Sequence, residues 1–182
     1  VSSGANLDSK AVQVPVSLLG PGTILVLQRE VPMAENAAAI RRARERGARI
    51  VLSLAPAGPI EPARFQDVDI IIANENEAAA LDPQAAGGLR QGLVVTRGAA
   101  GATAHLADGR IIAAPARAIT PVDTTGAGDT FAGVLAAYLD EGADLRAAMA
   151  KAAVAGSLAC TKAGAQPSFP MRAEIEAAFA KI

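Results

Sequence analysis

The strongest chemical pattern in this chain is a glycine-rich turn followed by an acidic residue and an apolar helix. Residues 123–131 read Asp-Thr-Thr-Gly-Ala-Gly-Asp-Thr-Phe. Gly126, Ala127 and Gly128 are small, so their backbone N–H groups stay open to a ligand, and the positive end of the following helix favours an anion there. Asp129 would repel a resting phosphate, so its carboxylate suggests that a second group is held or deprotonated beside the anion. An Asp that only caps the helix after a glycine turn is an equally good interpretation.

Two common nucleotide-binding patterns do not fit this turn. It lacks the lysine of a P-loop, and it does not match the dinucleotide fingerprint with its later acidic residue. A Walker-type NTPase and a Rossmann dehydrogenase are therefore both disfavoured.

Polar clusters also follow three of the predicted strands. They are Gln28-Arg29-Glu30, Asn74-Glu75-Asn76-Glu77 and the segment from Thr96 to Gly101. Each cluster alone is better explained as an ordinary polar loop. Because the carboxyl ends of parallel strands share one edge of a sheet, the clusters together favour a single ligand cleft.

The elements that must position these residues alternate along the chain. Short β-branched runs predict strands at 23–27, 49–54, 68–72 and 93–96, and helical periodicity predicts helices at 34–46, 75–81, 130–140, 145–161 and 171–181. Asp108-Gly109 is typical of a tight hairpin turn between strands at 102–106 and 110–113. The predicted fold class is α/β: a mostly parallel sheet with helices on both faces and a small antiparallel hairpin.

Composition excludes several classes of function. The 182 residues are 51% apolar with a net charge of −1, and no concentrated basic face indicates nucleic-acid binding. No apolar run approaches the roughly 20 residues that span a bilayer, and no secretory leader opens the chain as written. The single cysteine, Cys160, fits a small buried residue in a reducing cytoplasm.

Residues 123–131 closely resemble the signature of the ribokinase-like (PfkB) carbohydrate kinase family. Other segments follow in the order of that family: residues 74–77 are similar to its N-x-x-E motif, residues 96–101 to its nucleotide loop, and residues 164–168 to the C-terminal segment of its ribokinase branch. The resemblance runs along essentially the whole chain. It implies a ribokinase-like fold and transfer of a phosphoryl group from ATP to the primary hydroxyl of a sugar.

The resemblance also implies roles for individual residues. Asp129 would be the catalytic base beside an anion hole formed by the amides of Gly126, Ala127 and Gly128, and Glu30 would contact the sugar. The residues that would bind ATP and Mg²⁺ are Asn74, Glu77, Thr96, Arg97, Gly98, Ala99, Ala100, Gly101 and Gly128, with part of 152–156 closing on the adenine. Those of a K⁺ loop would be Asp123, Thr125, Ala159, Lys162, Gly164 and Ser168.

Two departures from the family pattern qualify these expectations. Residues 1–6 resemble an interior segment of the family, and the stretch between Leu81 and Leu93 is short for a helix with its turns. We therefore expect residues 1–182 to form the C-terminal, nucleotide-binding and catalytic portion of the domain, without the N-terminal strands and lid.

Several alternatives stay open from the sequence. Ribose is favoured over fructose, ketodeoxygluconate or a nucleoside as substrate, and a truncated, non-catalytic nucleotide-binding domain is the competing class. The expected partners are ATP and a small sugar, with no nucleic acid and no membrane; a homodimer is left open.

Overall fold

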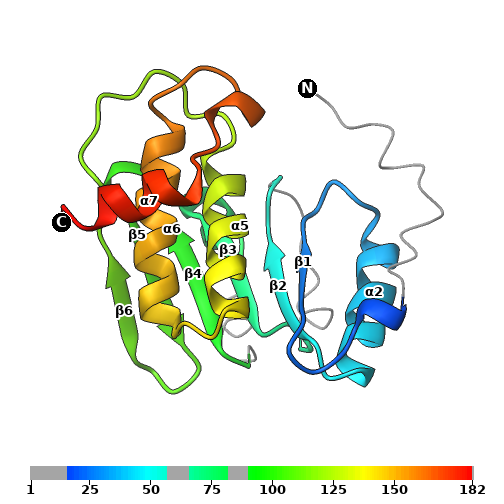
Figure 1. Cartoon of the computed structure of the whole chain (residues 1–182). Helices are drawn as coiled ribbons and strands as arrows, with labels where there is room; N and C mark the ends of the chain where they lie inside the picture. The colour runs from blue at the N-terminus through cyan, green and yellow to red at the C-terminus, as the bar shows by residue number, and fades with distance from the viewer. Residues whose placement is uncertain (1–15, 57–65, 82–89, 182) are drawn as a thin grey trace. The chain divides into compact units, whose positions relative to one another are not determined.

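The computed structural model describes residues 16–56, 66–81 and 90–181 (Figure 1). Short strands alternate with helices along the chain. The strands are β1 (Ile24–Leu27), β2 (Arg49–Ser53), β3 (Ile70–Asn74), β4 (Gly92–Thr96), β5 (Ala102–Leu106) and β6 (Ile111–Ala114). The helices are α2 (Met33–Glu45), α3 (Glu75–Ala79), α5 (Ala127–Asp140), α6 (Leu145–Ala159) and α7 (Arg172–Phe179), with short 3-10 turns η1 (Val16–Leu18), η3 (Gly98–Ala100) and η4 (Gln166–Ser168).

The strands form a sheet in the order β1-β2-β3-β4-β5-β6. β1, β2 and β3 pair in parallel, with Leu25 opposite Ile50 and Leu52 opposite Ile71. The β4-β5-β6 portion is antiparallel. β5 and β6 are joined by a turn in which the Leu106 N–H donates to the Arg110 carbonyl at 2.9 Å. The predicted α/β class, with a mostly parallel sheet and an antiparallel hairpin, is confirmed.

The chain divides into two compact units, and the first contains the described residues of 1–95 and 105–110. Its core is aliphatic because β2 and β3 are buried along nearly their whole length. α2 faces β2 with small side chains, which lets the helix approach the strand closely. The main buried residues are Ala39, Ile40, Ala43, Ile50, Leu52, Leu54, Val68 and Ile71. The buried Asp69 carboxylate accepts from the Ile50 amide and from Arg44, each at 2.8 Å, so its charge is paired.

The second unit contains residues 96–104 and the described part of 111–182. Here α6 packs against α5, α7 and β6, and Figure 1 shows α5 beside α6 and α7 lying across α6. Small residues allow this packing: a Cβ at Gly156 of α6 would stand 3.4 Å from the Ala127 carbonyl oxygen of α5. Polar contacts hold α7, since Glu176 accepts from both Tyr138 and Lys151.

The predicted elements are all found, with shifted ends. β3 begins at Ile70 rather than at 68 and continues to Asn74, and α5 begins at Ala127 rather than at 130. The predicted helix at 34–46 is α2, and Gly47 follows its end with a left-handed φ of 78°.

Two sequence interpretations fall largely beyond the part of the chain that the structure describes. The opening segment 1–6 and most of the short stretch between Leu81 and Leu93 belong to residues outside it. Among the described residues, none of the helices has the length and apolar character needed to cross a membrane.

Candidate nucleotide-binding and catalytic site

Gly126 shapes the start of α5 as its N-cap residue. Its φ of 77° is in the left-handed region, which glycine adopts at little cost. A Cβ at this position would stand 3.1 Å from the Cβ of Ala165 and 3.5 Å from the ring of Phe169. The amide and the hydroxyl of Thr130 both donate to the Gly126 carbonyl at 2.8 Å. Glycine is therefore required here by the turn and by the close approach of the 165–169 segment.

The amides at this helix start are only partly occupied by the protein. The Ala127 N–H donates to the Thr124 carbonyl at 3.2 Å. For Gly126 and Gly128, the described residues provide no acceptor. The space beside Gly128, where a Cβ would stand, is open. Of the predicted anion donors, Gly126 and Gly128 are thus available to a ligand, and Ala127 is already bonded.

Asp129 is the third residue of α5, and its side chain is exposed. The N-cap is Gly126, and no side chain makes a cap hydrogen bond there. Asp129 is therefore not the N-cap, which removes that alternative interpretation. Across the described ranges no hydrogen bond or ion pair engages its carboxylate, so the group is in water and open to a substrate.

The loop after β4 folds back tightly on itself. The Arg97 N–H donates to the Gly101 carbonyl at 2.7 Å, and the Gly101 N–H donates to the Gly98 carbonyl at 3.0 Å. Gly101 has a φ of 87°, and a Cβ on it would stand 2.1 Å from the Ala114 carbonyl oxygen. This glycine lets the loop lie directly against the end of β6.

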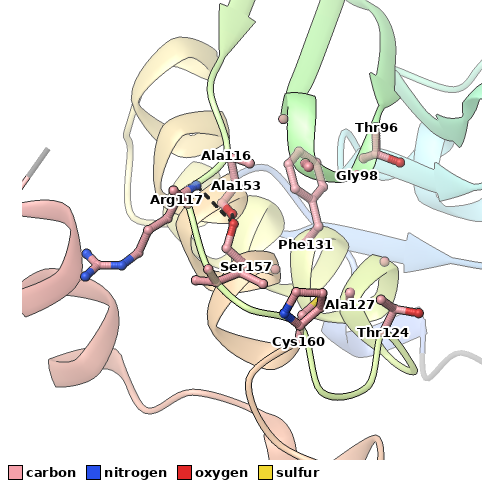
Figure 2. Close-up of a pocket in the computed structure, with 17 residues that line it drawn as sticks. Thr96, Gly98, Ala116, Arg117, Thr124, Ala127, Phe131, Ala153, Ser157 and Cys160 are labelled. Atoms are coloured by element: carbon pink, nitrogen blue, oxygen red, sulfur yellow. Dashed lines mark hydrogen bonds between the residues drawn. The ribbon is translucent and has the colours of Figure 1, made fainter.

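A pocket of about 470 Å³ lies within the second unit (Figure 2). This volume is in the range of roughly 300–1,000 Å³ that small-molecule sites occupy. Most of the lining is apolar or glycine, which suits a flat ring, and the Gly128 backbone lies at its border. The lining residues are Thr96, Gly98, Ala99 and Gly101 of the loop, Ala116–Ile119 and Pro121 after β6, Thr124, Ala127 and Gly128, Phe131 of α5, and Ala153, Gly156, Ser157 and Cys160.

The pocket brings together many of the residues that the sequence predicts for ATP. It contains most of the 96–101 loop, Ala127 and Gly128, and two residues of the segment expected to close on the adenine. Within the 96–101 loop and the 126–129 turn, four predicted residues are not among its lining: Arg97, Ala100, Gly126 and Asp129.

Two parts of the pocket lining were not predicted from the sequence. They are the segment 116–121, called the wall below, and Phe131. The wall has neither periodicity nor a motif, so it carried no signal, whereas the apolar face of α5 could have pointed to Phe131. Cys160 also lines the pocket, and burial raises the pKa of its thiol.

Asp123 joins two segments that are far apart in the sequence. Its carboxylate accepts from the Thr125 N–H at 2.9 Å and from the Gly164 N–H at 2.8 Å. Hydrogen bonds from the Thr125 side chain, the Thr125 amide and the Gly164 amide lower the pKa of Asp123 to about 2. Three residues of the predicted cation loop, Asp123, Thr125 and Gly164, therefore lie together.

The other predicted cation-loop residues make contacts of their own. The Lys162 amide donates to the Ala159 carbonyl at 3.4 Å, and Lys162 Nζ pairs with Glu174 at 3.3 Å. Ser168 is buried, and its hydroxyl donates to the Ala165 carbonyl at 2.6 Å. In residues 16–56, 66–81 and 90–181, no group of three or more His, Cys, Asp or Glu side chains could hold a metal ion. A potassium site lined by backbone carbonyls does not need such a group.

The first unit holds the remaining predicted residues, Glu30, Asn74 and Glu77. Asn74 and Glu77 form a capping box on α3: each side chain accepts from the other residue's amide at 2.9 Å. Glu77 is buried, and one of its carboxylate oxygens is used by the hydrogen bond from the Asn74 amide. Glu30 is half-buried, and its amide donates to the Gln28 side chain.

Comparison with known proteins assigns the chain to one family. The sequence model of the pfkB family carbohydrate kinases matches residues 2–172 of the chain. The chain belongs to this family. The glycine turn, the loop after β4 and the capping box at the end of β3 all lie within the matched residues.

Curated relatives carry the name ribokinase. The chain is 27% identical to the ribokinase of Schizosaccharomyces pombe over 198 residues, which covers 98% of the chain and 62% of that protein. It is 32% identical to the ribokinase of Bacillus subtilis over 158 residues, which covers 84% of the chain and 54% of that protein. The chain therefore spans roughly half to two thirds of the length of these relatives.

Solved structures agree with the fold. Ribokinase from Thermotoga maritima has a TM-score of 0.85 at 30% identity, covering 98% of this chain and 63% of that one. Ribokinase from Arabidopsis thaliana complexed with ribose and ATP has a TM-score of 0.81 at 27% identity, covering 86% and 55%. A nucleoside kinase from Burkholderia thailandensis in complex with inosine has a TM-score of 0.76 at 26% identity, covering 87% and 56%.

Proposed function

We propose that this chain is the nucleotide-binding and catalytic portion of an ATP-dependent sugar kinase, and that its substrate is ribose, converted to ribose 5-phosphate. The observation that carries the proposal is the start of α5. Among the described residues, the amides of Gly126 and Gly128 and the neighbouring Asp129 carboxylate have no partner, and Gly128 borders a pocket of nucleotide size. Such a helix start suits phosphate, and the pocket suits a base and its sugar.

In this mechanism Asp129 removes the proton from the primary hydroxyl of the sugar. The hydroxyl oxygen forms a bond to the γ-phosphorus, the bond from that phosphorus to the bridging oxygen breaks, and ADP leaves with the bond's electron pair. The amides of Gly126 and Gly128 stabilise the equatorial oxygens during transfer, because in phosphoryl transfer the protein mainly positions groups and stabilises charge. Asp129 is exposed in the free protein, so the substrate must displace the water around it.

The described residues fit the expected ions to different degrees. Glu77 uses its Oε2 in the capping box, and its other oxygen has no partner among the described residues, so it could help hold Mg²⁺ and its waters. Bound Mg²⁺ would neutralise charge on the phosphates. Around Asp123, the backbone carbonyls of the two joined segments could hold K⁺. Turnover that is the same in potassium and in sodium would remove the cation from the proposal.

The choice of ribose rests on resemblance and on the names of the relatives. Glu30 follows β1 in the sequence Gln-Arg-Glu-Val-Pro, where the ribokinase branch has a sugar-contacting glutamate. Its carboxylate has no partner within the described ranges, so it is free to accept a sugar hydroxyl. We also assign the protein to the cytoplasm, which its single cysteine supports and which cell fractionation would test.

Replacing Asp129 by Asn tests the base. Loss of a general base costs about 10²–10⁴ in rate. We expect Asp129→Asn to lose most ribose-dependent release of ADP while it still binds ATP, measured in a form that carries the full length of its relatives. Turnover close to that of the unaltered protein would overturn the assignment of Asp129.

A second candidate acceptor is a nucleoside, since a nucleoside kinase is among the structural neighbours. Comparing kcat/KM for ribose and for inosine in the same assay separates the two, because the hydroxyl is the same type and only the base differs. A chain that binds ATP but releases no ADP with either acceptor would instead be a non-catalytic nucleotide-binding domain.

A further inference from the structure

The outer wall of the pocket is an extended segment that belongs to no strand or helix. Residues 115–121 connect β6 to the turn before α5 without regular secondary structure. Ala116, Arg117, Ala118, Ile119 and Pro121 of this segment line the pocket. From Ala118 to Pro121, no backbone hydrogen bond to another described residue is found. The position of this wall therefore depends on its two ends.

The end nearer α5 is fixed by the last turn of α6. The amides of Val122 and Asp123 both donate to the Cys160 carbonyl, at 2.7 and 3.3 Å. These bonds use backbone atoms alone, so they do not depend on the side chains of the wall.

Arg117 fixes the other end, at the residue where the wall begins to cover the pocket. Its side chain turns away from the pocket toward α7, as Figure 2 shows, and Nη1 donates to the Ala178 carbonyl at 2.8 Å. Ala178 lies in the last turn of α7, where carbonyls lack intrahelical partners and a cation is favoured. Arg117 thus joins the wall to the last helix of the chain.

Ser157 holds the same point of the wall to α6. The Arg117 N–H donates to Ser157 Oγ at 3.1 Å, the contact drawn in Figure 2. The Ser157 hydroxyl donates in turn to the Ala153 carbonyl at 2.9 Å. Ser157 is buried, so water replaces these bonds poorly when they are lost.

We propose that Arg117 and Ser157 are positioning residues for the nucleotide, which set the distance between the 116–121 wall and α6 by tying the wall to α7 and α6. This inference rests on the proposed function, since it needs the pocket to hold a nucleotide. Loss of the hydrogen bond to α7 or of the one to α6 lowers the fraction of molecules in which the wall has the conformation that binds the nucleotide. The apparent Kd rises in inverse proportion to that fraction.

The test is the affinity of the complete chain for ADP, measured by calorimetry, together with the thermal midpoint of each variant. If only about a tenth of the molecules have the wall in its binding conformation, the apparent Kd for ADP rises about 10-fold. We expect this rise for Arg117→Met. Ser157→Ala should raise Kd by about 2- to 10-fold, the value of a neutral hydrogen bond. Arg117→Lys can still reach a carbonyl and should fall between Arg117→Met and the unaltered chain.

Arg172→Met is the matched control. Arg172 is also an arginine that binds α7 to its neighbours, through an ion pair with Glu141, but it does not line the pocket. We expect its Kd for ADP to stay within about 2-fold of the unaltered value, at a similar loss of thermal stability.

Three results would overturn the inference. They are unchanged ADP affinity in both Arg117→Met and Ser157→Ala, an equal loss in Arg172→Met, and equal affinities for Arg117→Lys and Arg117→Met. If Arg117→Met does not fold, Ser157→Ala and Arg117→Lys decide the matter. An unaltered chain that binds no ADP contradicts the proposed function itself, which separates that failure from a failure of the ties.

Discussion

Gly128 and Gly133 lie on the same helix, and for each the position of a Cβ is open space. Only Gly128 lines the pocket. A Cβ at either site meets no described atom within 4 Å, and valine is no worse than glycine in a helix. The pair therefore separates an effect on the ligand from an effect on the fold.

Gly128→Val should bind ADP at least about 10-fold more weakly, because its methyl groups occupy the path of a phosphate toward the free amides. Unfolding free energies of both variants should stay within about 1 kcal/mol of the unaltered chain. Calorimetry with ADP and urea unfolding measure the two quantities. If Gly128→Val binds ADP as tightly as Gly133→Val, the amides at this helix start are not the anion site.

For single residues, the sequence predicts a ligand site but not the position of every side chain in it. The nine residues 123–131 predict a ligand at a helix start but cannot tell whether Asp129 caps that helix. The structure decides this, because the helix begins at Ala127 and Gly126 is the cap. In the 96–101 loop, the sequence cannot separate the residues that line the pocket from Arg97 and Ala100. The fold of the turn decides which residues face the pocket.

At the scale of elements, Glu77 has two candidate tasks that one substitution can separate. Glutamine serves as well as glutamate in a capping box, so Glu77→Gln should keep the cap on α3 and change unfolding free energy by less than about 0.5 kcal/mol. Glu77→Ala should lose the hydrogen bond from the Asn74 amide while the Asn74 side chain still caps the helix, at a cost of about 1 kcal/mol. If Glu77 also helps to hold Mg²⁺, both variants should need about 10- to 100-fold more Mg²⁺ for half-maximal turnover.

The control for this comparison is a second capping glutamate. Glu174 accepts from the Met171 amide at 2.6 Å at the start of α7 and has no proposed role with Mg²⁺. Glu174→Gln should leave the Mg²⁺ requirement unchanged. A Glu77→Gln variant with an unchanged requirement as well would limit Glu77 to its cap.

The sequence predicts an element well where nearby residues, such as a turn glycine, determine where it ends. The hairpin follows from Asp108-Gly109, and the end of α2 follows from Gly47, because both glycines adopt left-handed conformations that local chemistry requires. The start of α5 was placed too late because small residues carry no helical periodicity. The wall at 116–121 has no local signal at all, since α6 and α7 hold it through Arg117, Val122 and Asp123.

At the scale of the whole chain, Asp123 and Gly164 show how long-range contacts complete the second unit. Their hydrogen bond joins positions that are 41 residues apart and brings the turn after α6 to the start of the 123–131 segment. Composition and spacing cannot reveal such a contact; only the family resemblance suggested it. The same contact makes stability depend on pH, because it holds the carboxylate in its charged form.

The pKa of Asp123 is about 2 in the folded chain, against 3.8 for the free group. A lowered pKa means that the unfolded chain binds the proton more readily, so the contribution to stability is present above pH 3.8 and is lost as the pH falls through about 2. Asp123→Asn cannot ionise and can accept through only one oxygen. We expect it to be less stable than the unaltered chain at pH 6 and the difference to shrink between pH 4 and pH 2, measured by urea unfolding. A difference that stays constant across this range would show that the Asp123 charge does not hold the two segments together, and the carboxylate would then lose its place in the proposed cation loop as well.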